Sequence, residues 1–245
     1  MSQLLVRGLL AGLLAGVLAF GFARVFGEPP VQAAIDFEGQ LAALHHEPEE
    51  PELVSRDIQS TLGLGTGVIV LAVAFGGAFA IAFAFAYGRL GSLHARGTAL
   101  VVALLGFVAC YGVPYLKFPP NPPAIGDPAT IQARTALYFA MMAIGILATF
   151  GAVRLQRQLA ASRSDIDAAL IAAAAFVIVV GITMFALPPL KEVPQGFPPN
   201  ILWDFRVASI GTQLVLWLAM GLTFGWLVER AQRTVSQPMP APAMR

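Results

Sequence analysis

Six runs of about twenty apolar residues constrain this chain more than any other feature of its sequence. A helix needs about 20 apolar residues to cross the hydrocarbon core of a bilayer. Transmembrane β-strands would be shorter and would alternate in polarity, which these runs do not. The sequence therefore predicts an all-α fold, a polytopic helical membrane bundle of about six spans. The runs cover 4–26, 62–87, 97–116, 135–153, 168–187 and 207–228.

Little chain remains outside these runs for a separate soluble domain. Of the 245 residues, 57% are hydrophobic and 12% are charged, which is unusual for a soluble domain. We expect a single integral membrane domain over 1–230, an acidic outer loop over 27–61 and a disordered cytoplasmic tail over 231–245. The single cysteine, Cys110, excludes an intrachain disulfide.

Two stretches of the chain, about seventy residues apart, share the same pattern of prolines and charges. The first contains Pro114, Lys117, Pro119-Pro120-Asn121 and then Arg134. The second contains Pro188, Lys191, Pro198-Pro199-Asn200 and then Arg206. Each unit is an apolar span, a proline-rich crossing and a returning apolar span. The chain is therefore predicted to be built from repeated helical hairpins, as many membrane transporters are.

A third, degenerate copy of the hairpin is indicated near the N-terminus. The segment Gly27-Glu28-Pro29-Pro30 follows the first span, and Arg56-Asp57 precedes the second. Because proline cannot continue a regular helix, each proline cluster is expected to end its span. The arginine that opens each returning span is expected either to pair with a nearby aspartate, which could also pair with Lys117 or Lys191, or to anchor the helix by snorkelling. The nearby aspartates are Asp57, Asp127 and Asp204.

The distribution of charge predicts the orientation in the membrane. If the N-terminus, the loops 88–96 and 154–167 and the C-terminal tail share one side, that side holds nine basic and three acidic residues. The other side holds six basic and eleven acidic residues. Since Lys and Arg are enriched in cytoplasmic loops, both termini are predicted to be cytoplasmic. The acidic loop 27–61 then faces outward.

An alternative interpretation makes the first span a cleaved signal peptide, because Val31-Gln32-Ala33 would satisfy a signal peptidase. Its apolar run is longer than the roughly 7–15 residues of a signal-peptide core. It also carries Gly8, Gly12 and Gly16 at four-residue spacing, a close-packing face for a helix pair. We therefore favour a retained membrane helix.

The middles of the six runs contain no Asp, Glu, Lys, Arg or His. Intramembrane charges are costly and functional by default, so their absence argues against a proton relay at the bilayer midplane. It also argues against haem held by paired histidines. The sequence contains neither a P-loop nor a His-Glu-x-x-His zinc motif. We expect a protein that is not an enzyme and that holds no permanent cofactor.

Sulfur occurs at equivalent places in the two hairpins. Aligning Pro114 with Pro188 places Cys110 opposite Met184, each one helical turn before its proline. Soft sulfur ligands would suit a borderline metal ion in transit. Cys and Met are also ordinary apolar fillers, so packing is the alternative interpretation.

The acidic side holds most of the residues that could bind a metal. In the segment 41–52, His45 and His46 lie beside Glu47 and three further glutamates. Imidazole together with carboxylate suits cobalt, nickel or zinc, whereas carboxylate alone would suit calcium or magnesium. We predict capture of a divalent ion by His45, His46 and Glu47, followed by hand-over to Glu38 and Glu28. A solvated acidic loop is the alternative interpretation.

The proline-rich crossings are predicted to form an outer mouth or gate. Because cationic residues repel a metal ion, those at the mouth must be paired with acids or move during transport. The spans lack charges, so the ion would pass by backbone carbonyls at broken helices or by ligands of a partner. The predicted mouth residues are Lys117, Asn121, Arg134, Asn200, Asp204 and Arg206.

One long motif carries a family resemblance. It begins at Lys117, continues through Pro119-Pro120-Asn121-Pro122-Pro123 and Arg134, and ends at Phe139. Further similarity covers 5–12, 25–31 and 197–206, so the likeness extends over nearly the whole chain. In these segments the sequence closely resembles the CbtA family of probable cobalt transporter subunits.

The resemblance implies uptake of Co²⁺ for cobalamin synthesis in a bacterial inner membrane. It also implies a small single-span partner subunit, CbtB-like, with a histidine motif, and association into an oligomer is compatible with it. The family is commonly described with about five spans, whereas six runs here are long enough to cross a bilayer. The alternative function is a membrane assembly or accessory protein that binds a partner and transports nothing.

Overall fold

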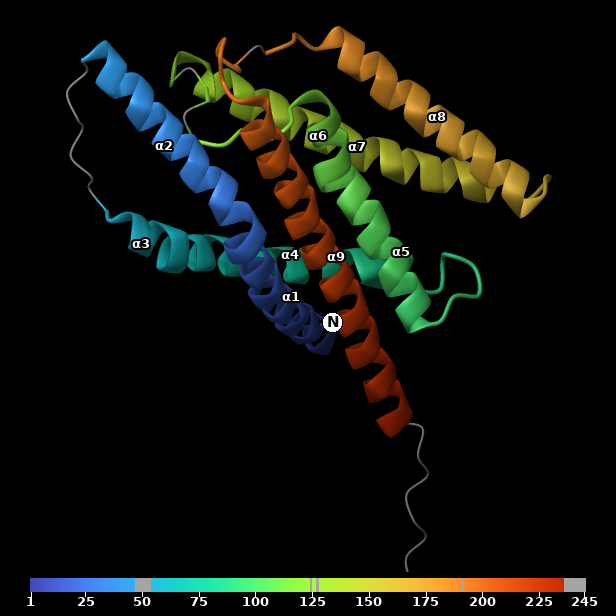
Figure 1. Ribbon diagram of the computed structural model, residues 1–245. Helices are drawn as coiled ribbons and strands as arrows, with labels where there is room; N and C mark the ends of the chain where they lie inside the picture. The colour runs from blue at the N-terminus through green and yellow to red at the C-terminus, as the bar shows by residue number, and fades with distance from the viewer. Residues whose placement is uncertain (47–53, 124, 127, 191, 236–245) are drawn as a thin grey trace, which may run out of the picture. The chain divides into compact units, whose positions relative to one another are not determined.

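The computed structural model describes residues 1–46, 54–123, 125–126, 128–190 and 192–235, and these residues are predominantly helical (Figure 1). Six helical stretches among them are long and apolar enough to cross a membrane, which confirms the predicted multi-pass helical bundle. The α-helices are α1 (Ser2–Phe22), α2 (Glu28–His45), α3 (Arg56–Ile58), α4 (Leu64–Ala86), α5 (Ala95–Phe107), α6 (Val113–Lys117), α7 (Ile131–Leu159), α8 (Asp165–Ala186) and α9 (Pro199–Val235).

In the described part of the chain, three π-helical turns connect helices without a break: η1 (Ala23–Gly27), η2 (Gln59–Gly63) and η3 (Val108–Gly112). All three end on a glycine. After η1 and η3 the first proline follows two residues later, at Pro29 and Pro114. Proline lacks an amide hydrogen and clashes with the preceding turn, and a π-helical turn is one local solution to that conflict. The prediction that proline clusters end their spans is therefore wrong for Pro29-Pro30, where the helix continues into α2. It is correct for Pro119-Pro120, because α6 ends at Lys117, and for α8, which ends at Ala186 before Pro188.

The structure differs from the predicted outer loop 27–61, because Glu28–His45 forms the helix α2. Pro29 and Pro30 lie in its first turn, where a missing amide hydrogen costs little. The helix ends at His46, whose φ of 54° lies in the left-handed region and whose N–H donates to the carbonyls of Ala42 and Ala43. At the other end of the chain, α9 extends to Val235 and so includes the first residues of the predicted tail; 236–245 lie outside the described residues.

The chain divides into two compact units, and the first comprises Met1–Phe20, Leu62–Leu104 and the chain from Val215 onward. In this unit α1 packs against α4 with the two backbones in contact. A Cβ atom on Gly8 or Gly76 would collide with the carbonyl oxygen of the other glycine, and one on Gly16 would lie 2.8 Å from Cβ of Ala72. The glycine face predicted for the first span is confirmed.

A second close contact in the first unit joins α5 to α9. A Cβ on Gly221 would lie 2.8 Å from Cβ of Ala103, and one on Gly225 would lie 2.9 Å from Cα of Arg96. Next to this contact the ring of Phe224 meets the ring of Phe83 edge-on, with 4.9 Å between centroids. Small residues bring the helices together and aromatic rings fill the remaining space.

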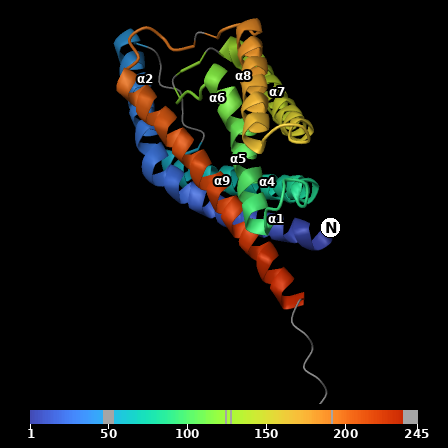
Figure 2. The ribbon, with the colours of Figure 1, turned by 90° about the vertical axis from the view of Figure 1, so that its right-hand side faces the viewer.

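The second unit comprises Gly21–Thr61 and Leu105–Leu214. Within it α7 and α8 lie side by side (Figures 1 and 2). Its core contains Val113, Phe118, Met141 and Val180. On α7, a Cβ atom on Gly145 would lie 2.5 Å from the carbonyl oxygen of Ala109, so this helix packs directly on the π-helical turn η3. This packing fixes the end of α6 and the start of α7, where the polar residues of the second unit gather.

Candidate functional site

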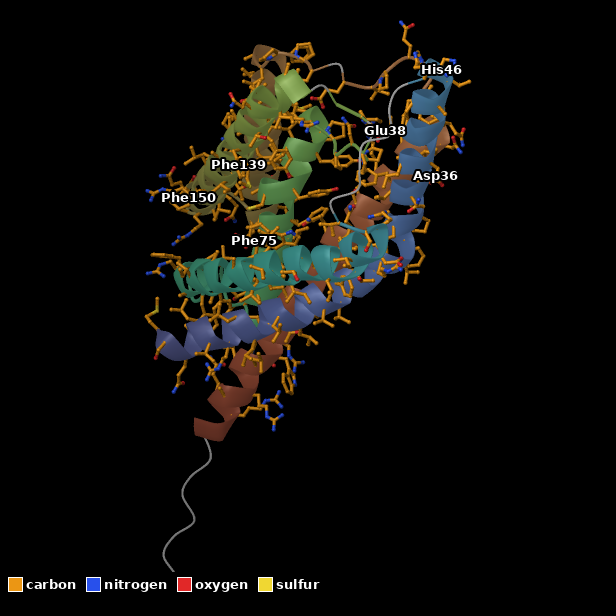
Figure 3. All side chains as sticks on the ribbon, turned by 90° about the vertical axis from the view of Figure 1, so that its left-hand side faces the viewer. Asp36, Glu38, His46, Phe75, Phe139 and Phe150 are labelled. Atoms are coloured by element: carbon orange, nitrogen blue, oxygen red, sulfur yellow. The ribbon has the colours of Figure 1, made fainter. Side chains whose placement is uncertain are left out.

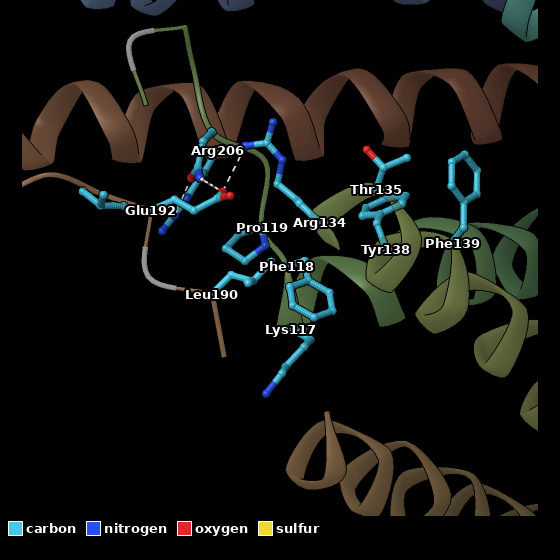
Figure 4. Close-up of a pocket in the computed structure, with 12 residues that line it drawn as sticks. Lys117, Phe118, Pro119, Arg134, Thr135, Tyr138, Phe139, Leu190, Glu192 and Arg206 are labelled. Carbon is cyan, nitrogen blue, oxygen red and sulfur yellow. Dashed lines mark hydrogen bonds and ion pairs between the residues drawn. The ribbon is translucent and has the colours of Figure 1, made fainter. Parts of the chain in front are cut away.

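A cavity of about 320 Å³ lies in the second unit beside the end of α6 and the first turns of α7 (Figure 4). Four of the predicted mouth residues line it: Lys117, Asn121, Arg134 and Arg206. The other two, Asn200 and Asp204, are exposed on α9 and are not part of the lining. The repeated motif therefore assembles around one cavity, with contributions from both proline-rich crossings.

Glu192, in the second crossing, is the centre of a polar network across the cavity wall. Its Oε2 accepts hydrogen bonds from Nη1 of Arg134 at 3.0 Å and Nδ2 of Asn121 at 3.2 Å. Its Oε1 accepts from Oγ1 of Thr130 at 2.9 Å. The side chain of Glu192 is 6% exposed and that of Arg134 is 35% exposed. A carboxylate buried to this degree needs such partners, and here three residues of the first hairpin supply them.

Arg206 and Lys117 complete the network with neutral acceptors. Nη2 of Arg206 donates to Oδ1 of Asn121 at 2.9 Å, and its Nε donates to the carbonyl oxygen of Pro120 at 3.4 Å. Nζ of Lys117 donates to the carbonyl oxygen of Met184 at 2.8 Å. Each of these bonds joins residues of different hairpins. They therefore hold together the C-terminal end of α6, the N-terminal ends of α7 and α9 and the two crossings.

Each arginine that opens a returning helix has a hydrogen-bonding partner. That partner is not the nearby aspartate that the sequence analysis considered. Arg56 forms an ion pair with Glu28 and also donates from Nε to Oε1 of Gln32 at 3.2 Å. No ion pair of Asp57 or Asp204 is found among the described residues; Asp127 lies outside them. The expected pairing of Asp57 and Asp204 with these arginines was therefore wrong, because each arginine reaches across to another segment rather than to its chain neighbour; Lys191, the other partner considered, lies outside the described residues.

The predicted metal ligands of the N-terminal segment are spread along α2. Glu38 lies within this helix, and His46 caps its C-terminal end (Figure 3). Glu38, His45 and His46 are exposed, and Glu28 is 8% exposed and bonded to Arg56. Glu28 and His45 begin and end an 18-residue helix, so about 25 Å separates them along its axis.

One ion cannot bind all of these residues together. Glu38 and His45 share a face of α2 but are two turns, or about 10 Å, apart. Glu47 lies outside the described residues. No group of three or more His, Cys, Asp or Glu side chains that could hold a metal occurs in the described part of the chain. The predicted ligands that the structure describes therefore lie one after another along α2 and do not surround a single point.

The two sulfur candidates have different surroundings. Cys110 is half-buried in the π-helical turn η3. Met184 packs against the core around Val113 and Met141, and its backbone carbonyl accepts the bond from Lys117. Since Met184 has a packing role of its own, its position does not require a ligand role.

Glu192 is the residue of this candidate site that the motif did not single out. In the repeat alignment Lys117 matches Lys191, so Phe118 matches Glu192. Phe118 packs in the apolar core, whereas Glu192 bonds three residues of the first hairpin. The sequence contained one indication of this role. At this position the two copies of the repeat differ, because one has a carboxylate and the other has a phenylalanine that is buried.

Comparison with known proteins assigns the chain to a family. The family model described as "Probable cobalt transporter subunit (CbtA)" matches residues 1–229 of the 245-residue chain. No curated protein and no solved structure matches it. The match covers five of the six helices that are long and apolar enough to cross a membrane, the sixth as far as Glu229, and both proline-rich crossings. The chain belongs to the CbtA family of probable cobalt transporter subunits.

Proposed function

We propose that this chain is the multi-span subunit of a transporter that takes Co²⁺ up through a bacterial inner membrane and supplies cobalamin synthesis. The observation that carries the proposal is its membership of a family of probable cobalt transporter subunits. A polytopic chain with six membrane helices fits that role. The word subunit in the family description favours a partner, which we take to be a small single-span protein with a histidine motif.

In this proposal the ion is first bound at the C-terminal end of α2. His45 and His46 are exposed there, and Glu47 follows directly in the sequence. Imidazole and carboxylate are suitable ligands for a borderline divalent ion. Glu38 and then Glu28 would receive the ion in turn along the helix. Glu28 becomes available only when Arg56 moves away, which couples that last step to a rearrangement of α3.

The cavity network would act as a gate at the outer mouth, with Glu192 and Arg134 paired while the gate is closed. Glu192 and Arg134 neutralise each other across the two hairpins. A divalent ion would compete with Arg134 for the Glu192 carboxylate, since carboxylate is a ligand for such ions. Opening the mouth would then require the ion pair to separate.

Within the membrane helices the backbone offers oxygen atoms in place of charged side chains. Pro114 has no amide hydrogen to donate to the carbonyl of Cys110, one turn earlier. Carbonyls at interrupted helices coordinate ions in many transporters. The π-helical turns η1, η2 and η3 are therefore the proposed places for such contacts.

Uptake of radioactive cobalt into cells tests the proposal. Cells would express the full chain with and without the small partner, and the variants compared would be His45→Ala/His46→Ala and His94→Ala. His94 is an exposed histidine outside α2 and serves as the matched control. We expect uptake to depend on the chain, to fall severalfold in the double variant and to remain unchanged in His94→Ala.

The outcomes separate the parts of the proposal. Chain-dependent uptake that is unaffected in the double variant would retain the transporter and remove the capture site. Absence of chain-dependent uptake of cobalt, nickel and zinc, with or without the partner, would favour the accessory role. In that case the partner would still co-purify with the chain although no ion moves.

A further inference from the structure

The cavity in the second unit has a surplus of positive charge. Among the residues that line it, in the described part of the chain, Lys117, Arg134 and Arg206 are cationic and Glu192 alone is acidic. Glu192 pairs with Arg134 at 3.0 Å. The charges of Lys117 and Arg206 are therefore not offset by a carboxylate of the lining.

These two cations have only neutral oxygens as partners in the described structure. Lys117 donates to the carbonyl of Met184, and Arg206 donates to the carbonyl of Pro120 and to Oδ1 of Asn121. These bonds use one of the three ammonium donors and two of the five guanidinium donors. Both side chains are half-buried. A charge that is partly removed from water and has no counter-charge attracts an anion more strongly than a solvated one.

The rest of the lining strengthens this attraction. Phe118, Phe139 and Leu190 form an apolar part of the wall, and water next to such a surface screens charges less than bulk solvent does. A volume of about 320 Å³ exceeds the share of a single water, about 30 Å³, several times. The cavity is therefore large enough for a small multi-atom ligand.

We infer that this cavity is a binding site for an oxyanion, a carboxylate or phosphate group, held by Arg206 and Lys117. The planar guanidinium of Arg206 suits the paired oxygens of such a group, and Lys117 adds a point charge. The site goes beyond the proposed transport of cobalt and does not depend on it. A free anion and the headgroup of an anionic lipid offer the same chemistry.

Calorimetric titration of the purified full-length chain in neutral detergent tests the site with inorganic phosphate and with citrate. The variants are Lys117→Gln, Arg206→Gln and the charge-conserving Arg206→Lys. The control is Arg154→Gln, which removes an exposed charge of α7 outside the cavity. We expect binding that weakens about tenfold or more in each Gln variant, is partly retained in Arg206→Lys and is unchanged in Arg154→Gln. Binding should also weaken as ionic strength rises.

A second experiment tests whether the anion that binds in the cavity is the headgroup of a lipid. The chain would be placed in nanodiscs of phosphatidylcholine alone or with phosphatidylglycerol, and its Tm measured. A rise in Tm with phosphatidylglycerol that is lost in Lys117→Gln assigns the site to a headgroup, whereas titration with phosphate or citrate in detergent assigns it to a free anion. If neither anion nor lipid has an effect, or if the effect is the same in all the variants, the inference is overturned. If Arg206→Gln fails to fold, the comparison of Lys117→Gln with the wild type still tests the site, because this variant loses only one hydrogen bond.

Discussion

Nη2 of Arg206 donates a hydrogen bond of 2.9 Å to Oδ1 of Asn121, 85 residues earlier in the chain. The reverse connection also exists, because Arg134 of the first hairpin pairs with Glu192 of the second crossing at 3.0 Å. The arginine of each hairpin thus bonds to the crossing of the other. Neither crossing can move far without breaking a bond to the opposite hairpin, so we expect the two to open together.

Replacing Glu192 by Gln is expected to destabilise the protein by about 1–3 kcal/mol, because Arg134 is left half-buried without its counter-charge. Unfolding of the purified chain in detergent, followed by tryptophan fluorescence, would measure the loss. Glu38→Gln is the matched control, since Glu38 is an exposed carboxylate with no ion pair among the described residues. Equal stability of the two variants would contradict the central role of Glu192.

The double variant Arg134→Gln/Glu192→Gln is expected to recover part of the stability that Glu192→Gln loses. Removal of both charges leaves no unpaired ion in the cavity wall, and replacing both partners of a buried pair costs less than replacing one. A double-mutant cycle in the same unfolding measurement gives the coupling energy. A coupling of zero would show that the 3.0 Å contact contributes nothing in solution.

Gly76→Ala is expected to destabilise the first unit by about 1–3 kcal/mol, because the added methyl group would collide with the backbone of α1 at Gly8. Gly67→Ala is the control on the same helix. A Cβ there meets no atom within 4 Å, so the change should be neutral or slightly stabilising, because Ala favours a helix more than Gly does. Thermal unfolding and the yield of folded protein in detergent would compare them. Similar behaviour of the two variants would mean that α1 and α4 do not pack as described.

Arg56→Gln is expected to free the Glu28 carboxylate and, if Glu28 receives the metal, to lower the KM for cobalt uptake a few-fold. The double variant Glu28→Gln/Arg56→Gln should lose that gain. Arg24→Gln serves as control, because Arg24 is an exposed arginine of η1 without an ion pair in the described residues. A KM that is identical in all three variants and the wild type would remove Glu28 from the path.

The membrane helices could be predicted because the length of an apolar run alone determines whether a helix can cross a bilayer. The helix α2 could not be predicted in this way. Its sequence is acidic and begins with two prolines, which is typical of a loop. It forms because it continues η1, so it needs no nucleus of its own, and because Pro29 and Pro30 fall in its first turn.

The repeat predicted which residues gather at the cavity but not how they pair. Equivalent positions such as Arg134 and Arg206 follow from the alignment of the two hairpins. Their partners do not, because Arg134 bonds a carboxylate and Arg206 an amide and a carbonyl. The counterpart of Glu192 in the first hairpin is Phe118 rather than an acidic residue, and a repeat cannot predict the role of a residue that differs between its copies.

The π-helical turn η3 has a consequence for the length of its helix. A π-helical turn holds one residue more than the α-helical turn it replaces, and one residue corresponds to about 100° of rotation in an α-helix. Deleting a single residue within Val108–Gly112 would convert the turn to α-helix and leave the following residues in phase, so that Lys117 would still face the carbonyl of Met184. The ring of Pro114 would then clash with the carbonyl one turn earlier. The extra residue therefore relieves this clash without turning the polar end of the span away from the neighbouring hairpin.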